Sequence, residues 1–315
     1  MKNFPINTDW LKIQEFYANI SVKLHEQGIK SLTTGGIACV LYGITQQTKD
    51  CDIIIPEERT EDVIDILEKL QIDDQRCQIT LKYGAPLNRD WLRGGWSSHT
   101  FFGTPENVVA RIDLFGRPPR VPLSQPDDNP HYLSRDGVAR MKKTRREKDW
   151  AYANQLGHQM LKRGEIEGVL HITDIETLVD TCKKNDIGLA LRNERPILQL
   201  AIENSPELER YVKAEKEFWS RLDHLRLTAY EKAWKPYGDA IQMDSKNLII
   251  LPFRTQNEAL IEHAEKHLDP SPLNTIGWEN LVNQAKDKTA QIFQNIDREL
   301  LPSPIAFTNG NGMTR

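Results

Sequence analysis

The feature that most restricts the fold is a short run, residues 50–55, in which two aspartates precede three isoleucines. The run begins Asp50-Cys51-Asp52, and Pro56 closes it. β-Branched residues favour an extended strand, and proline ends the strand because it cannot donate a ladder hydrogen bond. Successive side chains of a strand point to opposite faces, so Asp50 and Asp52 should share one face. We therefore expect a strand that presents two carboxylates; the alternative for the two aspartates is a solvated turn.

Two neighbouring carboxylates repel each other unless one holds a proton or a cation lies between them. Magnesium prefers carboxylate oxygens and is commonly held by one or two carboxylates together with substrate phosphates. Upstream, Gly35-Gly36 separates the short segment 30–34 from the apolar stretch 37–43. Glycine lets the backbone turn and approach a phosphate closely. These residues predict a site for a divalent cation and a phosphate-bearing ligand.

The first part of the chain alternates between helical and extended patterns. Apolar residues at helical spacing predict amphipathic helices over 9–27 and 58–70, and the stretch 37–43 is expected to be helical. Further strands are expected in CQITLKYG, HTFFG and VVARIDLFG. The loop 84–98 between the first two carries Gly94-Gly95 and His99 follows it. This loop is either a mobile substrate loop or a hairpin connection, and His99 is either a general base or a structural histidine.

The second part of the chain is mainly helical. Residues 118–130 hold five of the 17 prolines and predict a linker or a long surface crossing. Beyond them, a capping box of Thr173 with Glu176 and the pair Ser205-Pro206 predict helix starts, the second helix running to about residue 235. The run LIILPF, 248–253, is strand-like. We therefore predict an α+β chain: a mixed-sheet domain over 1–125, a helical domain over 126–300 and a disordered tail over 301–315.

Composition excludes several classes of function. The net charge of −4 argues against a protein coated by nucleic acid, although a local basic patch could bind phosphate. There is no apolar run long enough to span a bilayer and no secretory signal, which favours a cytoplasmic protein without a membrane partner. The scattered cysteines, with no Cys/His cluster, predict reduced thiols and no zinc site. No GxxxxGK[ST] or HExxH motif and no Ser-His-Asp order stands out.

The spacing of the glycines and aspartates carries a resemblance. Gly35-Gly36 is followed by 13 residues and then by Asp50-Cys51-Asp52-Ile53. This pattern resembles the nucleotidyltransferase superfamily, which has the polymerase beta-like fold. The resemblance implies that the Gly35-Gly36 backbone holds a triphosphate and that two magnesium ions bind a three-carboxylate set. It also requires a third carboxylate on a later strand, for which Asp113 in RIDLF is the candidate; otherwise Asp113 is an ordinary salt-bridged or edge-strand aspartate.

A second resemblance lies in ARMKKTRREKDWAYANQLG, residues 139–157. It is similar to the helix after the catalytic domain in the abortive-infection type of nucleotidyltransferase, which includes toxin components of toxin–antitoxin pairs. The resemblance implies that Lys142 or Lys143, together with Arg146, points at the triphosphate. The alternative is a solvated basic helix face. One departure is Gln46, which stands where those relatives commonly have an arginine.

We therefore expect a metal-dependent nucleotidyltransferase that moves a nucleoside monophosphate from a nucleoside triphosphate to a hydroxyl group. The acceptor could be an RNA end, such as that of a tRNA, a protein or a small molecule. The alternatives are a catalytically silent domain of this type that binds a partner protein, and an interaction protein whose helical half is the working part. Three aromatic residues, Trp219, Tyr230 and Trp234, are expected in the core rather than in a base-stacking platform.

Overall fold

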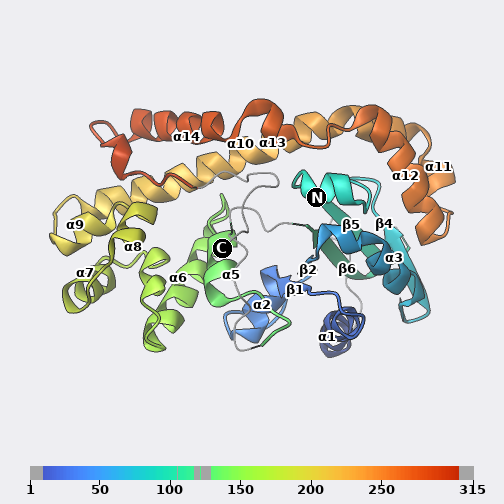
Figure 1. Cartoon of the computed structure of the whole chain (residues 1–315), viewed down its shortest axis with the longest axis horizontal. Coiled ribbons are helices and arrows are strands. Elements are labelled where there is room, and N and C mark those ends of the chain that lie inside the picture. The colour runs from blue at the N-terminus through green and yellow to red at the C-terminus, as the bar shows by residue number, and fades with distance from the viewer. Residues whose placement is uncertain (1–9, 105, 117–120, 122–128, 305–315) are drawn as a thin grey trace. The chain divides into compact units, whose positions relative to one another are not determined.

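The computed structural model describes residues 10–104, 106–116, 121 and 129–304 (Figure 1). The chain forms two compact units. Unit 1 comprises Met1–Pro119, Leu123–Leu133 and Tyr230–Pro272, and unit 2 comprises Arg120–Pro122, Ser134–Ala229 and Leu273–Arg315. The predicted borders divide the chain into consecutive domains. In the structure, residues 230–272 come after a segment of unit 2 but belong to unit 1. Of the predicted tail, residues 305–315 lie outside the described residues, while Leu301 is buried.

Unit 1 contains one mixed six-stranded sheet, which confirms the α+β class. Its order is β1-β2-β6-β5-β4-β3, and β2 and β6 are parallel while the other neighbours are antiparallel. The strands are β1 (Leu32–Thr34), β2 (Cys51–Ile54), β3 (Gln71–Ile72), β4 (Gln75–Ile79), β5 (Ser97–Gly103) and β6 (Val108–Phe115). The alternation of buried and half-buried residues along β6 leaves Arg111, Asp113 and Phe115 on one face.

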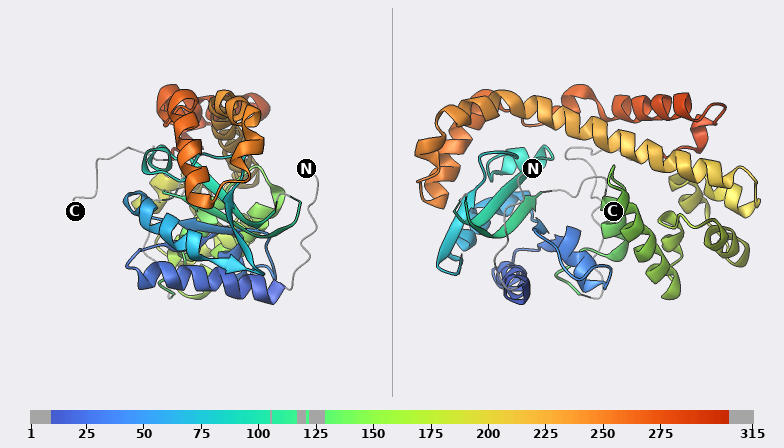
Figure 2. Two further views of the ribbon diagram at one scale, coloured as in Figure 1. Left: turned by 90° about the vertical axis from the view of Figure 1, so that its right-hand side faces the viewer. Right: turned by 180° about the vertical axis from the view of Figure 1, so that it is seen from behind.

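The helices of unit 1 include both amphipathic helices predicted from periodicity. Apolar side chains of α1 and α3, among them Ile13, Tyr17, Val63 and Leu67, enter the core with the isoleucines of β2. The helices are α1 (Trp10–Glu26), α2 (Gly35–Leu41), the 3-10 turn η1 (Glu57–Arg59), α3 (Thr60–Lys69), α4 (Arg89–Arg93), α11 (Ser245–Leu248) and α12 (Phe253–His267). Figure 2 shows these elements from two further sides.

Two buried side-chain amides attach α12 to the sheet. Ile79 donates its backbone N–H to Gln256 Oε1 over 2.8 Å and accepts from Gln256 Nε2 over 3.2 Å. Asn257 makes the same pair of bonds with the backbone of Leu87, at 2.8 and 2.9 Å. Each amide thus satisfies a peptide group that would otherwise be buried without a partner. The return of residues 230–272 therefore completes unit 1.

Unit 2 is helical in its described residues. Its long helix α10 (Leu208–Met243) continues from unit 2 into unit 1. The other elements are α5 (Arg135–Met141), α6 (Glu147–Lys162), η2 (Ile166–Leu170), α7 (Ile175–Lys184), α8 (Leu189–Glu194), α9 (Leu198–Ile202), α13 (Pro272–Ile276), α14 (Trp278–Ile292) and η3 (Arg298–Leu300). None of the described helices combines the length and apolar composition needed to cross a membrane. All four cysteines lie in the part of the chain that the structure describes, where they are buried and form no disulfide.

Three predictions of local structure were wrong. The segment 139–157 is not one helix: it is broken between α5 and α6, where Thr144 Oγ1 donates to Asp149 Oδ2 over 2.7 Å and accepts from Arg146 N. Helix α7 is capped by Asp174, whose side chain accepts from Thr177 N, and not by Thr173. The run 248–253 forms the end of α11, a turn and the start of α12 instead of a strand; Leu248 and Phe253 at its ends are buried, whereas Ile250 in the turn is 77% exposed.

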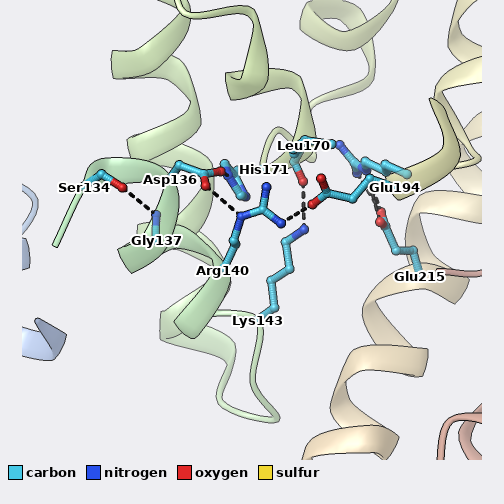
Figure 3. Close-up of polar contacts among 10 residues, drawn as sticks. Ser134, Asp136, Gly137, Arg140, Lys143, Leu170, His171, Glu194 and Glu215 are labelled. Atoms are coloured by element: carbon cyan, nitrogen blue, oxygen red, sulfur yellow. Dashed lines mark hydrogen bonds and ion pairs between the residues drawn. The ribbon is translucent and has the colours of Figure 1, made fainter. Parts of the chain in front are cut away.

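Charged side chains form a network inside unit 2 (Figure 3). The buried Arg195 donates to both carboxylate oxygens of Glu215 and to the carbonyl oxygens of Val169 and Ile172. Such a pair is costly to break because its partner would remain buried and charged. The network therefore holds η2 and the residues after it against α10.

Candidate functional site

The strand register places two of the predicted aspartates side by side. Asp52 of β2 is the direct neighbour of Asp113 on the parallel strand β6. Directly paired residues of neighbouring strands point to the same face of a sheet. Both residues are half-buried, whereas Cys51 and Ile53, which flank Asp52 and point to the opposite face, are fully buried. Asp50, two residues before Asp52, immediately precedes β2.

Gly35 and Gly36 lie against this carboxylate group. They are the first residues of α2, directly after β1, and Gly35 has a φ of +61°. A Cβ atom at Gly35 would lie 1.6 Å from Asp52 Oδ2, and one at Gly36 would lie 2.0 Å from Thr48 Oγ1. Only glycine avoids both clashes. The predicted glycine turn thus brings the backbone of Gly35 against the carboxylate of Asp52.

The carboxylates form one region of concentrated negative charge. Thr48 Oγ1 donates to Asp50 Oδ1 over 3.1 Å. Burial raises the pKa of the Cys51 thiol well above its usual value, and the charges of Asp52, Asp50 and Asp113 raise it further. Burial likewise raises the pKa of Tyr17, with added influence from Asp50 and Asp113. An electrostatic field of this sign attracts a cation.

His99 extends the group to a third strand. It pairs with Asp113 in the register of β5 and β6, and its Nδ1 lies 2.7 Å from Asp113 Oδ1. Its Nε2 lies 3.0 Å from Ser97 Oγ. Burial lowers the pKa of His99, but the charge and hydrogen bond of Asp113, with smaller effects of Asp52 and Asp50, outweigh burial and raise it overall. Ser97, His99 and Asp113 therefore form a hydrogen-bonded chain in the order serine, histidine, aspartate, contrary to the expectation that no such order stands out.

The loop before β5 is fastened at several points. It contains the short helix α4, so it is not a simple hairpin connection. Gly94 O accepts from Tyr230 Oη over 3.1 Å, and Trp96 Nε1 donates to Asp269 O over 2.9 Å. A Cβ atom at Gly84 would lie 2.6 Å from His99 Cδ2. The loop therefore packs against the edge of the His99 ring that faces away from the carboxylates.

The predicted triphosphate-binding cations lie in unit 2 and have local partners. Lys143 is buried and donates to Leu170 O over 2.9 Å, and burial lowers its pKa to about 8 (Figure 3). Lys142 Nζ lies 3.6 Å from Asp149 Oδ1. Arg146 is exposed and donates to Asp149 Oδ2 over 2.6 Å. The role of these three side chains in nucleotide binding stays a prediction. Gln46, the residue at which the sequence departs from the resembled pattern, is exposed.

The carboxylate oxygens of the aspartate group match the chemistry of a divalent metal ion. Among the residues that the structure describes, no three His, Cys, Asp or Glu side chains are gathered closely enough to hold an ion. The available donors are carboxylate oxygens, which are the ligands that magnesium prefers. Asp52 Oδ2 occupies the space that a side chain at Gly35 would fill, so the backbone leaves the carboxylate room. The residues therefore suit a hard divalent cation bound together with a phosphate.

Comparisons with protein-family models, with curated proteins and with solved structures found no match, so they do not indicate a function for this chain.

Sequence reasoning did not identify Ser97, and it left His99 undecided. Their spacing is the signal that could have found them, because residues i and i+2 of a strand share a face. Ser97 and His99 have this spacing in SSHTFF, but the predicted strand began only at His99 and left Ser97 in the loop 84–98. The register that brings His99 to Asp113 depends on the pairing of β5 with β6, which the sequence does not specify.

Proposed function

We propose that the protein is a metal-dependent nucleotidyltransferase that moves a nucleoside monophosphate from a nucleoside triphosphate to a hydroxyl acceptor. The observation that carries this proposal is the position of Gly35 against Asp52, with Asp113 in register beside Asp52. A close backbone approach to paired carboxylates suits a ligand that brings both phosphate and metal.

The chain's own residues supply binding and orientation. The backbone of Gly35-Gly36 would hold the triphosphate, because its N–H groups can approach phosphate oxygens without side chains in the way. Asp50, Asp52 and Asp113 would hold two magnesium ions, which when bound lower the pKa of the attacking hydroxyl and neutralise developing charge on the pyrophosphate. His99 holds Asp113 Oδ1 and so fixes the orientation of that carboxylate.

The test is nucleotide binding that depends on magnesium and on the aspartates. Asp50→Ala should abolish magnesium-dependent binding of nucleoside triphosphates measured by calorimetry. Asp90→Ala is the matched control, because Asp90 is an exposed aspartate of α4 and should leave binding intact. Radiolabelled triphosphates offered with total RNA and protein then identify the acceptor. Binding that persists in Asp50→Ala, or that needs no magnesium, would contradict the proposal.

The main alternative is a catalytically silent domain of the same architecture that binds a partner, as in a toxin–antitoxin pair. Such a protein could bind a triphosphate but would not release pyrophosphate. Pyrophosphate release by the wild type, measured with a coupled assay over total RNA and protein, separates these two functions. Its absence with every acceptor and triphosphate would favour the silent domain.

The hydrogen-bonded chain of Ser97, His99 and Asp113 favours a second candidate function, covalent hydrolysis with Ser97 as the nucleophile. A serine on a histidine that is held by a carboxylate is the arrangement that activates a hydroxyl. The two functions differ in the residues that they need. Ser97→Ala should abolish hydrolysis of activated esters but spare nucleotidyl transfer to an external acceptor, whereas Asp50→Ala should do the reverse.

A further inference from the structure

Tyr83 is the one exposed Phe, Trp or Tyr side chain among the residues that the structure describes. Its side chain is 64% exposed, in the loop between β4 and β5. Tyrosine presents a flat apolar ring of the kind that stacks on nucleobases. A single exposed ring needs no function by itself, so the argument depends on what lies next to it.

The neighbour of Tyr83 is a second ring that is held in a fixed position. The ring centroids of Tyr83 and Trp234 are 6.3 Å apart, with planes at 31°. Trp234 Nε1 donates to Gly84 O over 2.9 Å, and a Cβ atom at Gly238 would lie 2.3 Å from its indole ring. Trp234 is partly buried, so it is neither a pure core residue nor a free surface residue. Together the rings form a pair with one fixed and one exposed member, which we name the aromatic pair.

The aromatic pair is connected to the carboxylate site through Gly84. This glycine lies between Tyr83 and the His99 ring, with a positive φ of +81°, and His99 in turn contacts Asp113. The strand order β1-β2-β6-β5 puts the two carboxylate strands between β1, which leads into Gly35, and β5, which carries His99. The pair therefore lies on the His99 side of the carboxylates, away from the proposed triphosphate cradle.

We propose that the aromatic pair of Tyr83 and Trp234 stacks on an unpaired base of a single-stranded nucleic acid acceptor, whose end hydroxyl reaches the carboxylate site past His99. This inference rests on the proposed function, which assigns the triphosphate to Gly35-Gly36 and so leaves the His99 side to the acceptor. Stacking is tolerant of sequence because every base has an aromatic face.

The charges around the pair predict how binding responds to salt. In the loop and the stretch of α10 that carry the two rings, the exposed Lys82, Lys232 and Lys235 are nearly matched by the exposed Glu231 and Asp239. The slope of binding affinity against salt concentration reflects the number of phosphates that cations neutralise. Stacking at this nearly neutral surface should therefore give a shallow slope, whereas binding to the basic run 135–148 of unit 2 would give a steep one.

The experiment measures binding of a fluorescent oligoadenylate strand to the full chain in chelator, and separately binding of ATP to the full chain in saturating magnesium. Tyr83→Ala should weaken strand binding by at least about fivefold, since removal of one base-stacking ring commonly has that effect. Tyr83→Phe keeps the ring and should bind within about twofold of wild type, as ring stacking does not need the hydroxyl. Leu189→Ala is the matched control, because Leu189 is also 64% exposed but belongs to unit 2. ATP affinity should be equal in all four proteins.

Each contrary result has a separate meaning. Unchanged strand affinity in Tyr83→Ala, no strand binding by wild type, or a steep salt slope would overturn the stacking site. An equal loss of ATP affinity in Tyr83→Ala would assign the pair to the donor nucleotide and overturn the acceptor role. Transfer by the wild type separates this inference from the proposed function: a wild-type protein that binds the strand through Tyr83 but transfers no nucleotide would leave the stacking site standing while the transferase proposal fails. Loss of transfer in Asp52→Asn, with strand binding that still depends on Tyr83, is the result expected if both hold.

Discussion

The most constrained position in the candidate site is Gly35. It combines a positive φ with a backbone that lies where Asp52 leaves no room for a side chain. Gly43 also has a positive φ, of +69°, but a Cβ atom there would meet nothing within 4 Å. A substitution at Gly43 therefore measures the free-energy cost of the backbone conformation alone, whereas one at Gly35 adds the cost of the clash with Asp52.

The prediction is that Gly35→Ala destabilises far more than Gly43→Ala. A left-handed conformation costs an alanine about 1–2 kcal/mol, and this is the whole expected effect at Gly43. At Gly35, overpacking against Asp52 should add about 1–3 kcal/mol. Urea unfolding of both variants measures the difference in the free energy of unfolding. Equal losses at the two positions would mean that the backbone of Gly35 does not press on the aspartate.

Single residues also show how far the sequence could predict the site. Asp50 and Asp52 could be paired from strand alternation, because that period is local. The adjacency of Asp52 to Asp113 depends on a parallel pairing between strands more than 50 residues apart, which no local pattern encodes. The same is true of His99, whose role is set by the register of β5 against β6.

At the level of elements, the helix starts were harder to predict than the helices. Periodicity identified α1 and α3, whose apolar stripes face the core. It did not reveal the break between α5 and α6, where polar side chains compete with the helix for backbone hydrogen bonds. Nor could it show that α5 would be tied to the segment after η2 by a buried contact, in which His171 Nε2 lies 2.9 Å from Asp136 Oδ1 (Figure 3).

That contact predicts a loss of stability in mild acid. Burial lowers the pKa of His171 to about 3, so the folded protein keeps the ring neutral while the unfolded chain takes up a proton below pH 6.5. The unfolded state then binds more protons, and stability falls as the pH is lowered from about 6.5 towards 3, by up to about 1.4 kcal/mol per pH unit. Although burial raises the pKa of Asp136, its bonds to His171 and Arg140 lower it overall, so protonation of Asp136 adds to the loss at still lower pH.

The measurement is the free energy of unfolding between pH 7 and pH 4.5 in wild type and His171→Gln. Glutamine can still donate to Asp136 but does not titrate, so the slope should flatten by up to about 1.4 kcal/mol per pH unit. His267→Gln, at an exposed position, controls for the substitution itself. An unchanged slope in His171→Gln would show that other groups cause the acid sensitivity.

At the level of the whole molecule, the sequence predicted the class but not the division of the chain. The change from mixed to helical pattern is visible along the sequence. The return of residues 230–272 to unit 1 is not visible, because it is made by long-range contacts such as those of Gln256 and Asn257. A polar residue in a helix gives no local sign that it will pair with a distant peptide group.

The stability of the whole chain should also report on the carboxylate group. Without a cation the aspartates repel one another, so Asp52→Asn should melt above wild type in chelator, by about 2–4 °C for each kcal/mol of repulsion removed. With saturating magnesium the order should reverse, because binding to the folded state stabilises only a protein that binds the ion well. Thermal melts with and without magnesium test this. A variant that melts lower than wild type in chelator, with no magnesium effect on either protein, would make the aspartates structural.

The division of unit 1 between distant segments has a consequence for synthesis on the ribosome. The sheet is complete once residue 133 has emerged, but the amides of α12 that satisfy Ile79 and Leu87 follow about 120 residues later. At roughly 5–20 residues per second, the nascent sheet waits on the order of 6–25 s with those peptide groups uncovered. Translation speed through residues 134–257 thus sets how long the incomplete unit 1 is exposed to incorrect pairing.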